Sequence, residues 1–318
     1  MSSTHYDFHG VRLQVTTESP AAADALALRL GPFRTARPGN PDIELRYGVD
    51  ADRGSVPTGR PVYETPYGTV DYVEATDTLT ASLAGVGLTC QATIGVAQIA
   101  ARKLTGFELY LATHPLTTIC LMELLKRRER FPLHAGCVEL AQDFGALIAG
   151  PSGAGKSTLT IALARSGAAF LSDDVVFLTT KDGPLEVLAF PDTLGITEGT
   201  TRLFPELRER SGTADAGFPK LLARYEELWP GPLTAKTRPR VLLFPQIVAH
   251  ESRIEPLDAS EAMLRLVPDV LLTQPAGTQS HLKALAALVA QVDCYCVESG
   301  PDLEQTANLV RDLAAASV

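Results

Sequence analysis

An eight-residue glycine-rich motif constrains the fold of this chain more than any other segment. Residues 150–157 read Gly-Pro-Ser-Gly-Ala-Gly-Lys-Ser, which fits the pattern G-x-x-x-x-G-K-S of a phosphate-binding loop. Its glycines allow a tight turn that aims successive backbone N–H groups at a phosphate. Such a loop lies between a buried strand and a helix. The apolar run 144–149 predicts the strand, and apolar residues on one face of 157–165 predict the helix.

Each position of the motif has an expected role in binding a nucleoside triphosphate. Lys156 would place its charge between the β- and γ-phosphates, and Ser157 would ligate Mg²⁺ at the start of the helix. The helix N-terminus adds a partial positive charge. We therefore expect ATP and Mg²⁺ as ligands, and the expected phosphate site comprises Gly150, Pro151, Ser152, Gly153, Ala154, Gly155, Lys156, Ser157 and Thr158. The alternative is a loop that keeps this shape without a ligand.

Composition and charge narrow the class of protein. The chain has 318 residues, 45% of them hydrophobic, which suffices for one large or two moderate domains. Its net charge of −9 argues against a general nucleic-acid-binding surface. No apolar stretch approaches the roughly 20 residues that span a bilayer, and the N-terminus lacks a signal-peptide pattern, so we expect a cytoplasmic protein with no membrane partner. The sequence leaves the oligomeric state open and allows a homo-oligomer.

The five cysteines, odd in number and scattered, do not suggest a disulfide framework. Cys294 and Cys296 are two residues apart on a predicted strand and face the same way. They are either part of a buried strand or a pair of metal ligands.

The order of strand-like and helix-like segments predicts an α/β chain of two domains. Residues 1–115 would form a smaller α+β domain that binds a substrate or partner, and residues 116–318 carry the glycine-rich loop. Helices are predicted over 96–110, 116–128, 259–266, 280–292 and 302–315, and strands over 241–244 and 294–297. The polar stretch 205–239 predicts either a mobile substrate loop or a solvated surface excursion.

Two adjacent carboxylates follow the predicted helix. Asp173 and Asp174 interrupt an apolar run, 170–178, that predicts one strand. Charges inside a strand are costly unless a cation or hydrogen-bond donors compensate them, and bound Mg²⁺ would do so. Because neighbours on an undistorted strand point to opposite faces, we expect one to help hold Mg²⁺ and the other to accept a proton from an attacking hydroxyl. The alternative is a pair that closes a sheet end or caps a turn.

A histidine precedes the loop strand. His134 stands in the apolar run 131–138, which should form a strand next to the one that leads into the loop. From the pattern alone, it is either a satisfied core residue or a member of the site.

At these residues the chain resembles the HPr kinase-like family of P-loop kinases, which is related to ATP-dependent phosphoenolpyruvate carboxykinase. The similarity lies in four segments in the family's order: Leu133-His134-Ala135-Gly136, the loop 150–158, the short helix ending at Gly167, and Ser172-Asp173-Asp174-Val175. It is specific over 131–178 and weaker to about residue 300. The resemblance implies a kinase core with a mixed sheet in 116–318.

The resemblance also implies a role for each site residue. Lys156 would be the phosphate ligand, Asp173 the base that activates a serine hydroxyl, and His134 a neighbour of that base. Ser157 and Asp174 would be the Mg²⁺ ligands. A second signature of true HPr kinases, a Glu-Ile-Arg-Gly-Leu-Gly-like stretch, is absent, and residues 190–196 stand roughly in its place. The departure weakens the case for HPr as the substrate and for the reverse reaction.

The layout is more similar to HPr-kinase-related enzymes of peptide-modifying pathways, including kinases that phosphorylate the terminal serine of lasso peptide precursors. In that group a lysine before a Leu-Leu-like stretch often follows a variable loop, and Pro219-Lys220-Leu221-Leu222 looks similar. Lys220 is therefore expected to contact a phosphate or the substrate. The expected partner is a peptide or small protein that carries the acceptor hydroxyl.

Three functions stay open at this point. An ATP- and Mg²⁺-dependent kinase acting on a serine hydroxyl, or on a small molecule, needs positioning, charge neutralisation and a base, all of which the chain can supply. A regulatory protein would bind ATP without transferring its phosphate. A carboxykinase-like lyase would need further arginine and histidine ligands that the sequence does not identify.

Overall fold

The chain folds into two compact units, which together give a mixed α/β structure with several sheets. The computed structural model describes residues 2–37, 39–50, 57–181, 183–190, 194–196, 198–207, 221–228, 231–270 and 273–316. Unit 1 comprises Met1–Arg128, Thr213–Leu221 and Leu271–Gln279, and unit 2 comprises Glu129–Gly212, Leu222–Val270 and Ser280–Val318. Among the described helices, none has the length and apolar composition needed to cross a membrane.

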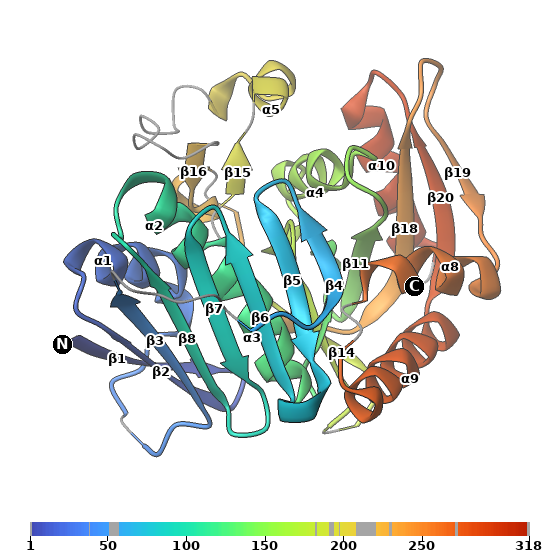
Figure 1. Ribbon diagram of the computed structural model, residues 1–318. Helices are drawn as coiled ribbons and strands as arrows, with labels where there is room; N and C mark the ends of the chain where they lie inside the picture. The colour runs from blue at the N-terminus through green and yellow to red at the C-terminus, as the bar shows by residue number, and fades with distance from the viewer. Residues whose placement is uncertain are drawn as a thin grey trace. The chain divides into compact units, whose positions relative to one another are not determined.

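Unit 1 is built on one eight-stranded sheet. Its elements are β1 (Ser2–Phe8), β2 (Val11–Thr17), α1 (Pro20–Arg29), β3 (Ile43–Val49), β4 (Arg60–Thr65), β5 (Gly68–Val73), β6 (Thr78–Leu83), β7 (Val86–Gln91), β8 (Val96–Ala101), α2 (Gly106–Thr113) and α3 (Pro115–Lys126). The strand order is β1-β2-β3-β8-β7-β6-β5-β4 (Figure 1). Every second residue of β2 is buried, as expected for a strand with one covered face. The three helices pack against one another and against this sheet.

Residues 96–110 do not form one helix, so that prediction is wrong. β8 lies between β3 and β7 in the sheet, and α2 begins only at Gly106. Alanine favours a helix when a segment is considered alone. Here Ala97, Ile99 and Ala100 are buried and β8 pairs with a strand on each side, so sheet pairing and burial outweigh helix propensity.

Unit 2 is centred on a six-stranded mixed sheet. From residue 129 onward the elements are β9 (Phe131–Leu133), β10 (Ala135–Ala141), β11 (Phe144–Ala149), α4 (Lys156–Arg165), β12 (Ala169–Ser172), β13 (Val176–Thr179), β14 (Glu186–Leu188), β15 (Leu194–Ile196), α5 (Glu198–Leu203), β16 (Leu221–Ala223), α7 (Tyr225–Leu228), β17 (Lys236–Thr237), β18 (Pro239–Ile247), β19 (Arg253–Pro256), α8 (Ala259–Leu266), α9 (Pro275–Gln291), β20 (Asp293–Ser299) and α10 (Leu303–Ala315). The six strands follow the order β12-β10-β11-β18-β20-β19.

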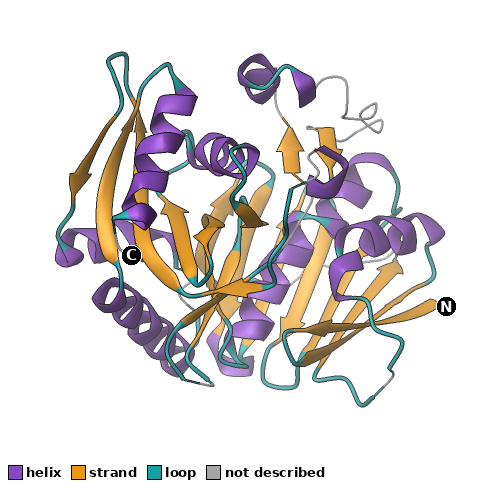
Figure 2. Cartoon of the chain, turned by 180° about the vertical axis from the view of Figure 1, so that it is seen from behind, coloured by secondary structure: helices purple, strands orange, loops and turns teal. Residues whose placement is uncertain are grey.

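The direction of these strands decides which residues share an edge of the sheet. β11, β18 and β20 are parallel to one another, and β10 is antiparallel to both β11 and β12. The carboxyl ends of β12, β11, β18 and β20 therefore lie at the same edge, together with the start of β10. α4 and α10 lie next to each other in both views of the chain (Figure 1, Figure 2) and pack on strands of this sheet.

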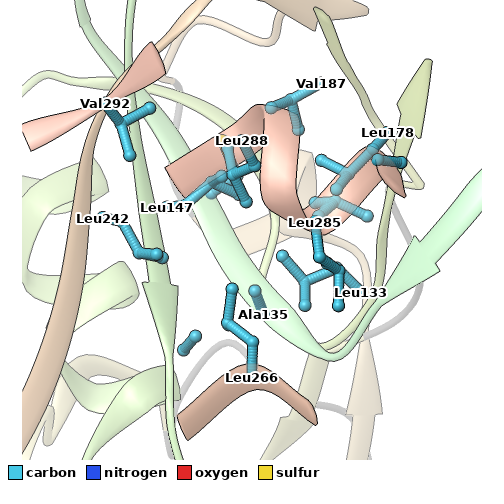
Figure 3. Packing of buried hydrophobic residues seen from close by; sticks show 14 of the residues in the cluster. Leu133, Ala135, Leu147, Leu178, Val187, Leu242, Leu266, Leu285, Leu288 and Val292 are labelled. Atoms are coloured by element: carbon cyan, nitrogen blue, oxygen red, sulfur yellow. The ribbon is translucent and has the colours of Figure 1, made fainter. Parts of the chain in front are cut away.

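A core of buried apolar side chains joins the sheet to α9. Leu285 and Leu288 point from α9 toward the strands that carry Leu133 and Leu147, and Leu242 of β18 belongs to the same cluster (Figure 3). Full burial of one such side chain stabilises the fold by about 1.5–3 kcal/mol. The strand that leads into the glycine-rich loop is therefore held firmly in place.

Two neighbouring stretches of chain pass between two sheets at the same point. A four-stranded sheet has the order β17-β14-β13-β9, and β9 runs on into β10 while β12 runs on into β13. β9 pairs with β13 and β10 pairs with β12, so the two stretches stay side by side on both sides of the crossing. We call this crossing the corner; it consists of His134 on one stretch and residues 173–175 on the other.

The prediction of one continuous strand over 170–178 is wrong, because the chain bends at Asp173 and Asp174 and changes sheet there. A bend between two strands removes the cost of placing two adjacent charges inside a ladder.

Candidate active site

The glycine-rich segment forms a tight loop between β11 and α4, so the strand and the helix predicted on either side of it are both present. Gly150, Gly153 and Gly155 have φ angles of 138°, 84° and 102°. Residues with a Cβ rarely adopt positive φ angles of this size, so the loop conformation favours glycine at all three positions.

Lys156 is the first residue of α4 and folds back over the loop. Its Nζ donates hydrogen bonds to the carbonyl oxygens of Gly150, at 2.7 Å, and Pro151, at 3.3 Å, and the side chain is buried. Phosphate oxygens would offer this ammonium group stronger, charge-assisted hydrogen bonds. Ser157 follows on the first turn of α4 and is exposed, so its hydroxyl is accessible to a ligand.

A glycine on β10 brings α4 close to the sheet. A Cβ built on Gly136 would lie 2.1 Å from Oγ1 of Thr160, far inside contact distance. The Thr160 hydroxyl donates to the carbonyl oxygen of Lys156 at 2.9 Å, which ties it to the first turn of α4. The missing side chain at position 136 thus sets how closely the loop helix approaches the strand that follows His134.

The histidine and the acidic pair meet at the corner. Nδ1 of His134 lies 3.0 Å from Oδ1 of Asp174. The side chain of Asp174 is 58% exposed, whereas Asp173 is only 8% exposed. The two carboxylates therefore occupy different environments. The resemblance implied a place for His134 beside Asp173; the structure shows a contact between His134 and the neighbouring residue, Asp174.

The loop and the corner lie at the same edge of the six-stranded sheet. β11 ends just before Gly150, β12 ends just before Asp173, and β10, which lies between them, begins just after His134. Neighbouring strands are about 4.8 Å apart, so the corner is roughly 5–10 Å from the loop strand. A phosphate chain held in the loop can reach groups at that distance. The residues predicted for phosphate binding and for proton transfer are thus brought together by the sheet.

The oxygen groups at this edge fit Mg²⁺ bound together with a nucleotide. The described part of the chain contains no cluster of three or more His, Cys, Asp or Glu side chains that could hold a metal ion by itself. Mg²⁺ does not require one, because it commonly binds through one or two carboxylates, substrate phosphates and several waters. Ser157 and Asp174 are both exposed and carry oxygen atoms that would suit this kind of binding.

Cys294 and Cys296 are free thiols on β20. Cys294 is buried, and burial, with a smaller contribution from the charge of Asp293, raises the pKa of its thiol. A raised pKa disfavours the thiolate that a metal would need. The buried-strand interpretation fits these cysteines better than the metal-ligand one.

Lys220 lies outside the described residues, as do the other residues of 208–220 in the stretch predicted to be a substrate loop. The described end of that stretch packs on the outer edge of β12. The backbone N–H of Phe170 donates to Pro232 O at 2.9 Å, the N–H of Thr234 donates to Phe170 O at 3.1 Å, and the ring of Tyr225 stacks on Phe170 with 4.3 Å between centroids. This part of the chain therefore covers the outer edge of β12, whose other edge pairs with β10.

Sequence reasoning missed one residue at this edge. Ile247 is the last residue of β18; it is 66% exposed, and its side chain lies against the loop, since a Cβ built on Gly155 would be 3.4 Å from its Cγ1. The apolar run that begins at Val241 predicts a strand. A strand that runs parallel to the loop strand and beside it ends at the same edge of the sheet, so the end of this run was a candidate for the site.

No family model and no curated protein matches this chain. Among solved structures, the chain is similar to the HPr(Ser) kinase/phosphatase from Coxiella burnetii, with 16% sequence identity, coverage of 58% of this chain and 89% of that chain, and a TM-score of 0.31. At this identity and TM-score the likeness does not establish a shared activity.

Proposed function

We propose that this protein is an ATP- and Mg²⁺-dependent kinase that transfers the γ-phosphate to a hydroxyl group. One observation carries the proposal: the loop with Lys156 and Ser157 lies at the same sheet edge as the corner with His134, Asp173 and Asp174. Phosphoryl transfer needs the phosphates held, their charge neutralised and the attacking hydroxyl positioned next to a base. The two halves of this edge supply these requirements separately.

The loop side would bind the nucleotide. Backbone N–H groups of residues 150–155 and the ammonium of Lys156 would surround the β- and γ-phosphates, and the N-terminus of α4 would add its positive end. Lys156 already donates two hydrogen bonds to loop carbonyls, so phosphate oxygens would replace acceptors that the side chain now uses.

The corner side would activate the acceptor. The acceptor oxygen forms a bond to the γ-phosphorus, the bond from that phosphorus to the β–γ bridging oxygen breaks, and ADP leaves with that electron pair. The hydroxyl proton passes to a carboxylate oxygen of Asp173. A buried carboxylate suits this role, because a group with little hydration is a more effective acceptor for a proton held close to it.

Ser157 and Asp174 would hold Mg²⁺, which when bound supplies charge neutralisation at the phosphates. His134 would fix the orientation of the Asp174 carboxylate through their 3.0 Å contact. A residue that hydrogen-bonds to a metal ligand fixes the orientation of that ligand, and its loss lowers metal affinity or activity by about 10- to 100-fold.

For the acceptor we propose a serine of a peptide or small protein in the cytoplasm, on the basis of the resemblance to kinases of peptide-modifying pathways. Lys220 is proposed as a further contact to phosphate or substrate on the same basis. A small-molecule hydroxyl is the second candidate acceptor.

Phosphate transfer can be tested directly by mass spectrometry. The protein is incubated with Mg-ATP and a panel of serine-containing peptides, and the products are searched for the mass of one added phosphate. A kinase gives a phosphate ester, a regulatory ATP-binding protein gives none, and a lyase produces phosphoenolpyruvate from oxaloacetate. Asp173→Asn should abolish transfer while ATP still binds. Unchanged transfer by this variant would contradict the assignment of Asp173 as the base.

A further inference from the structure

We infer that Ile247 forms the nucleoside-binding side of the site, where its side chain packs against the base of the bound nucleotide. This inference rests on the proposed function, because it takes the loop as the phosphate site and the corner as the place of transfer. It adds a subsite for a planar, largely apolar ring on the opposite side of the loop strand from the corner.

The order of the strands sets the direction in which the nucleotide must lie. His134 directly precedes β10 and Asp173 directly follows β12, so both lie on the same side of β11. The γ-phosphate has to approach these two residues for transfer. The β-phosphate is held by the loop at the end of β11. A triphosphate is a chain, so the α-phosphate and the nucleoside continue away from the corner, toward the ends of β18 and β20.

Ile247 is an exposed apolar group beside the loop on this side of β11. It ends β18, the strand directly beside β11, and its Cγ1 and Cδ1 would lie 3.4 and 3.8 Å from a Cβ built on Gly155. The remaining surface of the side chain is open to solvent, since Ile247 is 66% exposed. A base placed over it would remove apolar area of both partners from water.

The surrounding backbone holds Ile247 in a fixed position. Ile247 is in register with Ser299 of β20, and the next residue, Val248, donates its N–H to Ser299 O at 3.0 Å. The turn that follows is held by the N–H of Gly300, which donates to Oγ of Ser252 at 3.0 Å. An apolar contact that is ordered before the ligand arrives costs little conformational entropy on binding.

The chemistry of this contact predicts affinity without selectivity. An isoleucine side chain has no hydrogen-bonding group, so it supports adenine and guanine through the same dispersion and hydrophobic contact. Ile247 should therefore contribute to binding of ATP and GTP by similar factors, and it should contribute nothing to binding of a ligand that has phosphates and no nucleoside.

Titration calorimetry with three ligands tests the inference: Mg-ATP, Mg-GTP and magnesium tripolyphosphate. Ile247→Ala should weaken ATP and GTP binding by similar factors, about fivefold to tenfold for loss of a partly buried aliphatic contact, and leave tripolyphosphate binding unchanged. The matched control is Leu264→Ala on α8, which removes an even more exposed aliphatic side chain, 73% exposed, and should change none of the three affinities.

Two results would overturn the inference alone. Unchanged ATP affinity in Ile247→Ala would show that the base does not contact this side chain. An equal loss of ATP and tripolyphosphate affinity would show that Ile247 supports the shape of the loop and not the nucleoside. If the unchanged protein binds neither tripolyphosphate nor ATP, the proposed function fails and the nucleoside subsite fails with it.

Discussion

His134 and Asp174 face each other across the point where two strands leave one sheet for another, with Nδ1 of the imidazole 3.0 Å from Oδ1 of the carboxylate. Each residue is placed by pairing on both sides of it: Leu133 opposes Val176 in one sheet, and Cys137 opposes Ser172 in the other. Strand pairing before and after the corner therefore limits how far the backbone at either residue can move.

We expect His134→Ala to weaken the activity by releasing the Asp174 carboxylate. The Mg²⁺ concentration that gives half-maximal phosphate transfer should rise, or the rate at saturating Mg²⁺ should fall, by about 10- to 100-fold, as for loss of a residue that orients a metal ligand. His5→Ala in unit 1 is the control and should leave the Mg²⁺ dependence unchanged. A normal Mg²⁺ dependence in His134→Ala would mean that the contact between His134 and Asp174 does not orient a metal ligand.

Lys156→Met should lower the affinity for both ATP and tripolyphosphate by about tenfold or more, because it removes the charge while keeping most of the aliphatic chain. Calorimetry gives both affinities, and thermal unfolding shows whether the variant is folded. Lys283→Met, an exposed position on α9, serves as the control. Equal phosphate affinity in the two variants would exclude Lys156 as a phosphate ligand.

Gly136→Ala should destabilise unit 2 by about 1–3 kcal/mol, the usual cost of inserting atoms into a packed region. The new Cβ would lie 2.1 Å from Thr160 Oγ1, so α4 would have to move away from β10 and carry the loop with it. Chemical denaturation measures the effect, and Gly48→Ala is the control because a Cβ at that position meets nothing within 4 Å. Similar unfolding free energies for the two variants would contradict the close packing.

Much of the fold of unit 2 follows from local patterns in the sequence. The helix prediction over 259–266 is confirmed residue for residue, and that over 302–315 is confirmed with its start one residue later. The helix predicted over 280–292 is also present, but it begins five residues earlier, at Pro275, and ends at Gln291. The apolar residues of these segments recur with helical spacing, so they form one face of each helix, and that face packs on the core. The glycine-rich loop could be predicted equally well, because its conformation requires glycines whose positions can be read directly from the sequence.

The failed predictions concern pairing between distant segments. β8 was mistaken for part of a helix because nothing local shows that strands lie on both sides of it. The bend at Asp173 was missed for a similar reason, since a change of sheet depends on where β9 and β10 run and not on residues 170–178. Ile247 was missed because the contact between Gly155 and β18 depends on the order of strands.

A buried ion pair, between Glu123 and Lys126, gives a prediction on unit 1. Nζ of Lys126 lies 2.7 Å from Oε2 of Glu123, both side chains are 1% exposed, and the hydroxyl of Thr273 bonds to both groups. Burial lowers the pKa of Lys126, and Glu123 opposes this shift in part. Glu123→Gln should cost about 3–5 kcal/mol of stability, because the ammonium stays buried without its counter-charge.

The double variant Glu123→Leu, Lys126→Leu should recover part of that loss, since no buried charge remains from the pair, and Arg127, which also contacts Glu123, keeps Asp77 as its counter-charge. Urea unfolding of the two variants makes the comparison. A double variant less stable than Glu123→Gln would show that the attraction between the two charges exceeds the free-energy cost of removing them from water.

Asp77 should make unit 1 sensitive to acid. Burial alone would raise its pKa, but hydrogen bonds from Thr93 and Tyr72 and the charge of Arg127 outweigh burial, so the pKa of Asp77 lies below its ordinary value. A lowered folded-state pKa contributes stability that is complete above the unfolded value of about 4 and is lost as the pH falls through the folded value.

The difference in unfolding free energy between the unchanged protein and Asp77→Asn should therefore be largest near neutral pH and should shrink below about pH 4. Urea titrations across this range measure the difference. A difference that is constant with pH would mean that the carboxylate charge has no part in stabilising this region.

The corner has a mechanical consequence. Because both stretches cross between the sheets together, a sliding of one sheet relative to the other would carry His134 and Asp174 along as one body. Their contact would survive while the distance from the carboxylates to the loop changed. In the proposed kinase, such a motion would change the distance from the carboxylates to a phosphate without breaking the contact between His134 and Asp174.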